Sequence, residues 1–161
     1  MKQKDLKIIA QLRKNARMQL TDMSKKIRIP ISTIFDRIKT NEKGVITRYT
    51  SLLDFTKMGY NARAQIVFKI DKNERENFRD FLLKSEPINS VYKINNGYDY
   101  MVEGIFKQII DMELFIEDLE SKFKIEDKKV FFVIEDIKKE SFMSDSDLLF
   151  EDFPKMTDKS L

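Results

Sequence analysis

Residues 20–38 read LTDMSKKIRIPISTIFDRI, and this stretch decides the fold of the first third of the chain. Its apolar positions repeat at helical spacing as far as Ile27, and Pro30 follows shortly after. Proline cannot continue a helix but suits the first turn of a new one. One helix is therefore expected to end near Ile27 and the next to begin at Pro30 or Ile31. Two helices joined by so short a turn are typical of a helix-turn-helix.

The segments on either side complete this arrangement. Residues 3–15 contain neither Gly nor Pro and carry an apolar stripe at helical spacing, formed by Leu6, Ile8, Ile9 and Leu12. They predict a first helix that packs against the other two. Gly44 is placed to end the last helix, and the β-branched run 45–50 is expected to form a wing beside the helices.

The last helix of the three presents two different faces. Ile31, Ile34 and Ile38 cluster on one side, because each residue turns the helix by about 100°. The opposite side carries short polar residues and one lysine, namely Ser32, Thr33, Asp36, Lys39 and Thr40. Such side chains let a helix approach base edges closely and form hydrogen bonds with them. We interpret this helix as a recognition helix for double-stranded DNA.

The charge of the chain is distributed unevenly. Residues 1–50 hold 13 Lys and Arg against 4 Asp and Glu, a net charge of +9, and the remainder carries −6. Cations near the predicted turn and wing are candidates for phosphate contacts, namely Lys25, Lys26, Arg28, Arg37 and Arg48. The spacing of residues in the last helix also fits a small helical bundle whose polar face is only solvated. The sequence pattern alone therefore leaves open both DNA binding and this structural interpretation.

From residue 61 onward the periodicity changes. Alternating apolar residues predict a strand ending at Ile70, and Asn96-Gly97 between two apolar runs is a strong hairpin signal. We expect a helix, the two hairpin strands, a second helix and a last strand at residues 73–85, 90–94, 98–106, 109–123 and 129–137. The order βαββαβ is that of a ferredoxin-like antiparallel sheet backed by two helices, so the chain is predicted to be an α+β protein.

Composition excludes several classes of function. The 161 residues include no Cys and no His, which removes disulfides, Cys/His zinc sites, thiolate nucleophiles and imidazole bases. We expect no catalytic residues, no metal and no cofactor. No apolar run approaches the roughly 18 residues of a membrane span, and residues 1–6 lack the apolar core of a signal peptide. A cytoplasmic protein without membrane contact is expected.

As far as residue 142, the chain resembles the Lrp/AsnC family of feast-or-famine transcriptional regulators in these features. Residues 32–38 are similar to the recognition helix of that family, and residues 97–100 to the hairpin that borders its amino-acid effector site. The resemblance implies a winged helix-turn-helix, a linker and a ferredoxin-like effector and dimerisation domain, followed here by an acidic tail. The corresponding ranges are 1–50, 51–60, 61–140 and 141–161.

The resemblance also implies a function. A regulator of this family binds DNA sequence-specifically as a homodimer, tetramer or octamer, and responds to a small molecule such as an amino acid. The effector residues would be Asn96, Gly97, Tyr98 and Asp99, because turn amides and a carboxylate suit the two ends of a zwitterion. A structural ion pair fits Asp99 somewhat better than a ligand contact does, because a carboxylate in an otherwise apolar strand needs a partner.

Two other functions compete with this one. Siroheme decarboxylases resemble the same two-domain family, but that resemblance implies catalytic His residues, which this chain lacks. We therefore do not expect an enzyme. A regulator-like protein that has lost DNA binding is disfavoured by the basic first 50 residues.

Overall fold

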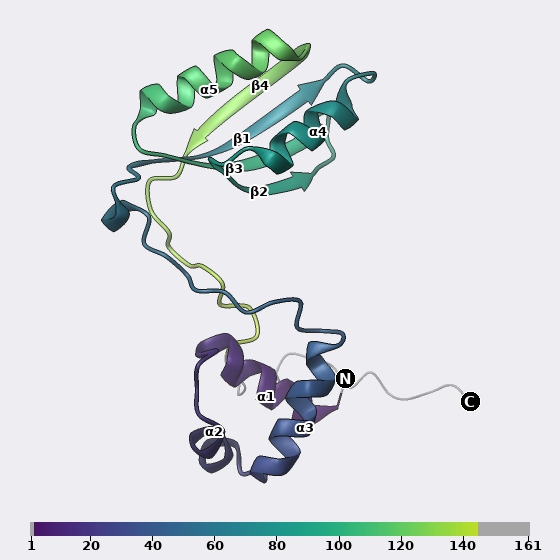
Figure 1. The fold of residues 1–161 in the computed structure, drawn as a ribbon, viewed down its shortest axis with the longest axis vertical. Helices are drawn as coiled ribbons and strands as arrows, with labels where there is room; N and C mark the ends of the chain where they lie inside the picture. Colours follow the sequence, from purple (N-terminus) through teal and green to yellow (C-terminus); the bar gives the residue numbers. More distant parts are fainter. Residues whose placement is uncertain (1, 145–161) are drawn as a thin grey trace, which may run out of the picture. The chain divides into compact units, whose positions relative to one another are not determined.

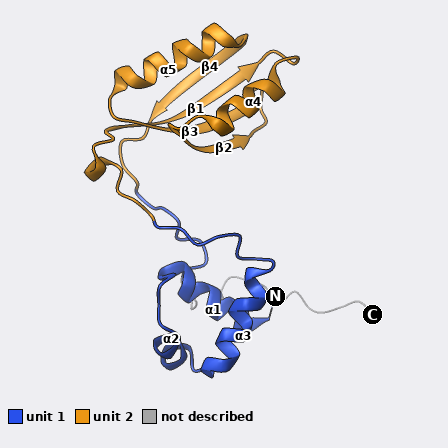
Figure 2. Cartoon of the chain, in the orientation of Figure 1, with its two compact units in different colours: residues 1–51, 137–161 blue, residues 52–136 orange. Residues whose placement is uncertain are grey.

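The computed structural model describes residues 2–144, which form two compact units (Figure 2). The helical unit contains the chain up to residue 51 together with residues 137–144, and the sheet unit contains residues 52–136. Among the described residues no helix is long and apolar enough to cross a membrane. The expected acidic tail lies outside the described residues from residue 145 onward.

The helical unit consists of the three predicted helices (Figure 1). They are α1 (Gln3–Lys14), α2 (Leu20–Ile27) and α3 (Ile31–Glu42). Their shared core contains the buried side chains of Ile8, Met23, Ile29 and Ile34. Ile31, the first residue of α3, stands at the edge of the packed region and is 44% exposed.

The turn between α2 and α3 is held by local hydrogen bonds. Arg28 ends α2 in the left-handed conformation, with φ 57° and ψ 45°, and its backbone N–H donates to the Ser24 carbonyl at 2.9 Å. The Ser24 hydroxyl donates to the Ile29 carbonyl at 2.7 Å. The position following α2 favours glycine, because a Cβ crowds the backbone there.

The segment after α3 departs from the prediction. Buried Asn41 donates from Nδ2 to the Arg37 carbonyl at 2.8 Å, and its own carbonyl accepts from the backbone N–H of Gly44 and Ile46. The chain then runs on through residues 45–50 without a strand. A β-branched run becomes a strand only where another strand offers its backbone groups, and the described part of the helical unit contains none.

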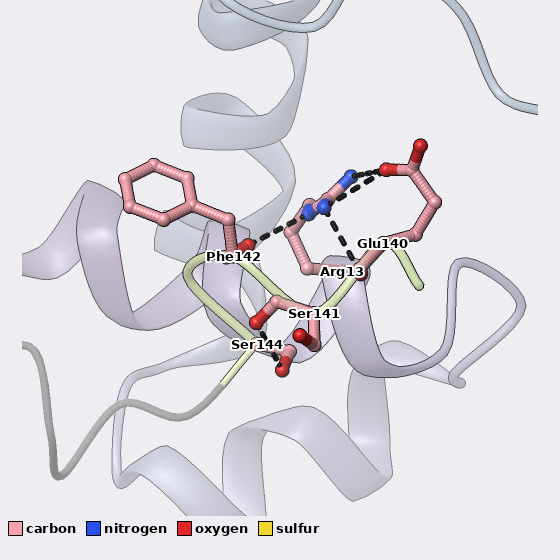
Figure 3. Close-up of polar contacts among 5 residues, drawn as sticks. All are labelled: Arg13, Glu140, Ser141, Phe142 and Ser144. Atoms are coloured by element: carbon pink, nitrogen blue, oxygen red, sulfur yellow. Dashed lines mark hydrogen bonds and ion pairs between the residues drawn. The ribbon is translucent and has the colours of Figure 1, made fainter. Parts of the chain in front are cut away.

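The end of the described chain returns to the helical unit, where Arg13 binds it (Figure 3). Both terminal nitrogens of Arg13 donate to the Glu140 carboxylate at 3.1 Å. The guanidinium also donates to two backbone carbonyls, those of Glu140 and Phe142, each at 3.0 Å. Residues 137–140, which the sequence places in the second domain, therefore group with the helices.

The sheet unit is a four-stranded antiparallel sheet in the order β2-β3-β1-β4, with two helices on one face (Figure 1). Its strands are β1 (Ala62–Ile70), β2 (Ile88–Lys93), β3 (Tyr100–Phe106) and β4 (Ile125–Phe132). The helices are α4 (Arg75–Lys84) and α5 (Ile109–Lys122), and a short 3-10 helix, η1 (Thr56–Met58), precedes β1. The predicted βαββαβ order and α+β class are confirmed.

The core of the sheet unit follows the predicted alternation. On β1 every second side chain from Ala62 to Ile70 is buried beneath the helices. The Phe68 and Phe78 rings meet edge to face at 5.2 Å between centroids, which joins β1 to α4. Within the described part of the sheet unit, both helices cover this one face and no helix covers the other (Figure 1).

The predicted position of the last strand is wrong. A strand was expected over 129–137, but β4 ends at Phe132, and Ile134 and Ile137 are more than 90% exposed. Strand β4 pairs with β1, and the Val133 N–H still donates to the Arg63 carbonyl at 2.9 Å. Because β1 begins at Ala62, later residues have no partner strand, and their β-branched side chains alone do not make one.

The left-handed Arg28 generates a testable prediction. Arg28→Gly should raise the free energy of unfolding by about 0.5–1 kcal/mol, because glycine adopts this conformation without the clash of a Cβ. Arg28→Ala removes the same charge but keeps the Cβ, and should not be stabilised. Denaturant titration of the three proteins measures the difference. Equal stability of the Gly and Ala variants would show that Arg28 is not strained.

Candidate nucleic-acid interface

The exposed face of α3 carries the polar residues that the sequence singled out. Ser32, Asp36, Lys39 and Thr40 are exposed, and their spacing places them along one side of the helix. Thr33 is half-buried at the margin of this side. The Thr40 hydroxyl donates to the Asp36 carbonyl at 2.8 Å, so the Thr40 oxygen remains able to accept a hydrogen bond. We call Ser32, Asp36, Lys39 and Thr40 the α3 polar face.

An aromatic ring borders this face. Phe35 is 46% exposed, and the Lys39 ammonium lies 4.4 Å from its ring centroid. A cation over an aromatic face is attracted by the electron density of the ring. The contact holds the long Lys39 side chain against the helix surface. The i,i+4 spacing of the two residues is the signal from which the sequence analysis could have found this pair.

Four of the proposed phosphate-binding cations are exposed, namely Lys25, Lys26, Arg28 and Arg48. Within residues 2–144 none of the four forms an ion pair, so their charge is available to a partner. Lys25 and Lys26 lie in the last turn of α2, where positive charge also stabilises the carbonyl end of the helix.

Arg37 has an intramolecular partner. Its Nη1 lies 3.6 Å from Oδ2 of Asp5, a buried residue in the first turn of α1. The ion pair therefore joins α1 to α3 and helps to set the orientation of α3 relative to α1. The sequence instead predicts a phosphate contact for Arg37. Asp5 is distant along the chain, so this ion pair cannot be read from the spacing of residues within α3.

The hairpin between β2 and β3 has the expected tight turn. Asn96 and Gly97 both adopt positive φ, 63° and 88°, which matches the right-handed twist of the flanking strands. The Ile94 N–H donates to the Asp99 carbonyl at 3.0 Å and closes the turn. Both turn residues are exposed.

The two side chains that follow the turn have different partners. Asp99 pairs with Nη2 of Arg75 at 2.8 Å and accepts the Ile70 N–H at 2.9 Å, so its carboxylate is held inside the sheet unit. The Tyr98 hydroxyl donates to Asp127 on β4 at 2.6 Å, and this hydrogen bond lowers the pKa of the Asp127 carboxyl. The four proposed effector residues therefore do not converge on one point.

Two cavities are relevant to a small molecule. One of about 390 Å³ adjoins Asp99 and is lined by α4 and β2. A larger one, of about 820 Å³, is lined by the region around η1, α5 and the far end of β3, away from the hairpin. In the part of the chain that the structure describes, no group of three or more Asp or Glu is arranged to hold a metal ion.

Comparison with known proteins agrees with this geometry. Residues 1–40 match a family model described as winged helix-turn-helix DNA-binding. The HTH-type transcriptional regulator FL11 of Pyrococcus furiosus is 32% identical over 114 residues, which cover 70% of this chain and 76% of that protein.

Two solved structures share the fold. The transcriptional regulator NMB0573 of Neisseria meningitidis, crystallised in complex with L-Met, has a TM-score of 0.81 and 25% identity, covering 86% of this chain and 93% of its own. An AsnC family transcriptional regulator of Agrobacterium tumefaciens has a TM-score of 0.78 and 22% identity, covering 86% of this chain and 94% of its own.

All three proteins are named as transcriptional regulators rather than as enzymes. The sequence identity with FL11 extends over a stretch longer than either unit of this chain. Taken with the helix-turn-helix and the ferredoxin-like sheet, this similarity shows that the chain belongs to the Lrp/AsnC family of transcriptional regulators.

Proposed function

We propose that this regulator binds specific double-stranded DNA sequences as a homodimer or larger homo-oligomer, and that a small molecule such as an amino acid modulates it. The α3 polar face is the observation that carries the proposal. It offers hydroxyl, carboxylate and ammonium groups on an exposed helix, and the cations nearby form no ion pair with other described residues.

The residues divide into two roles in DNA binding. Ser32, Thr33, Asp36 and Lys39 lie on or beside the α3 polar face and contact base edges in the major groove. Lys25, Lys26, Arg28 and Arg48 bind phosphates, which contribute affinity without reading sequence. Arg37, assigned to DNA from the sequence, acts through Asp5 as a positioning residue in this proposal.

The open face of the sheet supports self-association. Strand pairing places Val67, Met101, Tyr92 and Phe131 on the side that lacks helices. Tyr92 and Phe131 are each more than half exposed, and Gln65 on the same face has a buried side-chain oxygen without a hydrogen-bond donor in the described structure. A second copy of the chain, related to the first by a two-fold axis, would cover this apolar surface. The resulting dimer would present two copies of α3 to a near-palindromic DNA site.

The effector is proposed to bind beside the β2–β3 hairpin, near Asn96, Gly97, Tyr98 and Asp99. The complex of the Neisseria meningitidis regulator with L-Met supports an amino acid as the ligand class. The cavity that adjoins Asp99 supports the location, because its volume suits a small molecule. A ligand there would act on oligomeric assembly and thereby on the spacing of the recognition helices.

The affinity for DNA should fall steeply as the salt concentration rises. Substitutions should also separate the residues that bind phosphates from those that contact bases. If about six phosphates are neutralised per dimer, log affinity against log salt should have a slope of about −5. Lys25→Glu and Lys26→Glu should weaken all sequences alike, whereas Ser32→Ala and Asp36→Ala should change which sequence is preferred. Fluorescence anisotropy on duplexes recovered by genomic footprinting measures both effects.

Lys84→Glu, an equal change of charge on the sheet unit, serves as the control and should leave affinity nearly unchanged. Affinity that stays flat between low and moderate salt would contradict the proposed phosphate contacts. Unchanged sequence preference in both the Ser32 and Asp36 variants would contradict the role of the α3 polar face.

The chain should sediment as a dimer or larger species at micromolar concentration. Phe131→Glu places a charge on the open sheet face. The dissociation constant of the assembly should rise at least tenfold, because an unpaired carboxylate would be buried in the interface. Ile110→Glu changes a similarly exposed apolar residue on α5 and should leave the dimer intact. Analytical ultracentrifugation distinguishes these outcomes, and a wild-type monomer would refute the proposed interface.

A further inference from the structure

One side of α3, next to its polar face, is both apolar and exposed. Ile31, Phe35 and Lys39 follow one another at four-residue spacing and therefore share this side of the helix. Ile31 and Phe35 are each nearly half exposed, and the Lys39 ammonium lies over the Phe35 ring. Contacts with phosphates do not use apolar side chains, so the proposed phosphate binding does not explain this pair. We call Ile31, Phe35 and Lys39 the α3 strip.

Cations lie in the same helix-turn-helix as the strip. Arg28 stands three residues before Ile31, and Lys25 and Lys26 lie in the last turn of α2. All three cations are exposed, and none forms an ion pair with another residue of the range 2–144. This surface therefore suits a partner that combines apolar side chains with negative charge.

The chain itself supplies such a segment after residue 144. Residues 147–153 read DLLFEDF, in which acidic and apolar side chains are interspersed. Residues 145–161 hold five Asp and Glu against two Lys, a net charge of −3, whereas residues 1–50 carry +9. The segment thus has the charge and the apolar side chains that the α3 strip and its neighbouring cations would bind.

Arg13 holds the start of this segment against the helical unit (Figure 3). Its guanidinium binds the Glu140 carboxylate and the carbonyls of Glu140 and Phe142. The nine residues 145–153 span up to about 30 Å when extended. A compact unit of some 50 residues is roughly 25 Å across, so the segment is long enough to reach α3.

We propose that residues 145–161 bind the α3 strip of their own chain and compete with DNA for it. The apolar side chains of the segment cover Ile31 and Phe35, and its carboxylates bind Lys39 and Arg28. DNA would use the same two cations in the proposed function, so the segment and DNA exclude each other. The inference adds an autoinhibitory contact and rests on the DNA-binding half of the proposed function.

The tether makes a weak contact sufficient. A short linker gives an effective concentration of about 1 mM. A segment whose untethered counterpart binds with a Kd of about 0.25 mM would then occupy the strip for about four fifths of the time. Competition of that strength lowers the affinity for DNA about fivefold. Because opposite charges contribute to the contact, the inhibition should decrease as the salt concentration rises.

A change without charge separates docking from long-range attraction. Leu149→Ser combined with Phe150→Ser should raise the affinity for DNA about fivefold, equally for all duplexes, because it removes the apolar part of the contact. Ile110→Ser combined with Leu114→Ser changes two exposed apolar residues of α5 and should leave the affinity unchanged. Fluorescence anisotropy on the full chain measures both.

A second pair of variants tests the acidic side chains. Glu151→Gln combined with Asp152→Asn should raise the affinity for DNA at least threefold at low salt, because exposed ion pairs are lost. Glu113→Gln combined with Glu117→Gln removes the same charge from exposed positions of α5 and should have a smaller effect. Equal gains from the two pairs would show that only the net charge of the chain matters, and would overturn the proposed contact.

Disulfide trapping tests the contact without DNA. The chain contains no Cys, so an introduced pair reports one contact. Ile31→Cys combined with Phe150→Cys should form a disulfide within one chain under mild oxidation, and added duplex DNA should slow its formation. Ile110→Cys combined with Phe150→Cys serves as the control and should form the disulfide much more slowly.

The trapping result distinguishes failure of this inference from failure of the proposed function. Equal disulfide formation in the two pairs, or linkage between two chains instead of within one, would overturn the intramolecular contact even if DNA binding is intact. Unchanged DNA affinity in the Leu149 and Phe150 double variant would overturn the competition. If no duplex is bound by any variant, the DNA-binding half of the proposed function fails and the competition fails with it.

Discussion

Strand β1 is hydrogen-bonded along both of its edges, and the rest of the sheet unit depends on this one ladder. Ile66 lies opposite Val102 on β3 and Val130 on β4, so a shift of β1 by one residue would turn its apolar side chains away from both helices. The end of β1 also fixes the hairpin, because the Ile70 N–H binds the Asp99 side chain and the Phe68 carbonyl accepts the Asp99 N–H. Asp99 in turn holds Arg75 at the start of α4. The cavity proposed as the effector site is therefore positioned by β1.

Local signals were sufficient to predict most of the fold from the sequence. The proline before α3, the alternation along β1 and the Asn96-Gly97 turn each act over a few residues, and each appears in the structure as expected. The errors occurred where pairing partners decide the outcome. Strand β4 ends beside the beginning of β1, and residues 45–50 have no strand beside them in the described structure.

The candidate site was likewise predictable from the sequence only where its residues lie within one element. Helical spacing alone gave the α3 polar face, because all of its members lie on one helix. The partner of Arg37 belongs to α1, and the residues that line the cavity beside Asp99 come from loops, a helix and two strands. Periodicity within one element contains no information about such groupings, which arise only when the chain is folded.

The contact of Arg13 with residues 140–142 makes the helical unit discontinuous in sequence, since the whole sheet unit is inserted between its two parts. A ribosome synthesises the chain from its amino terminus, and domains generally fold as they emerge. The three helices would thus form before the sheet unit, but their contact with residues 140–142 can be made only after β4 has been synthesised. The order of synthesis therefore makes the helical unit begin folding before the sheet unit and reach completion after it.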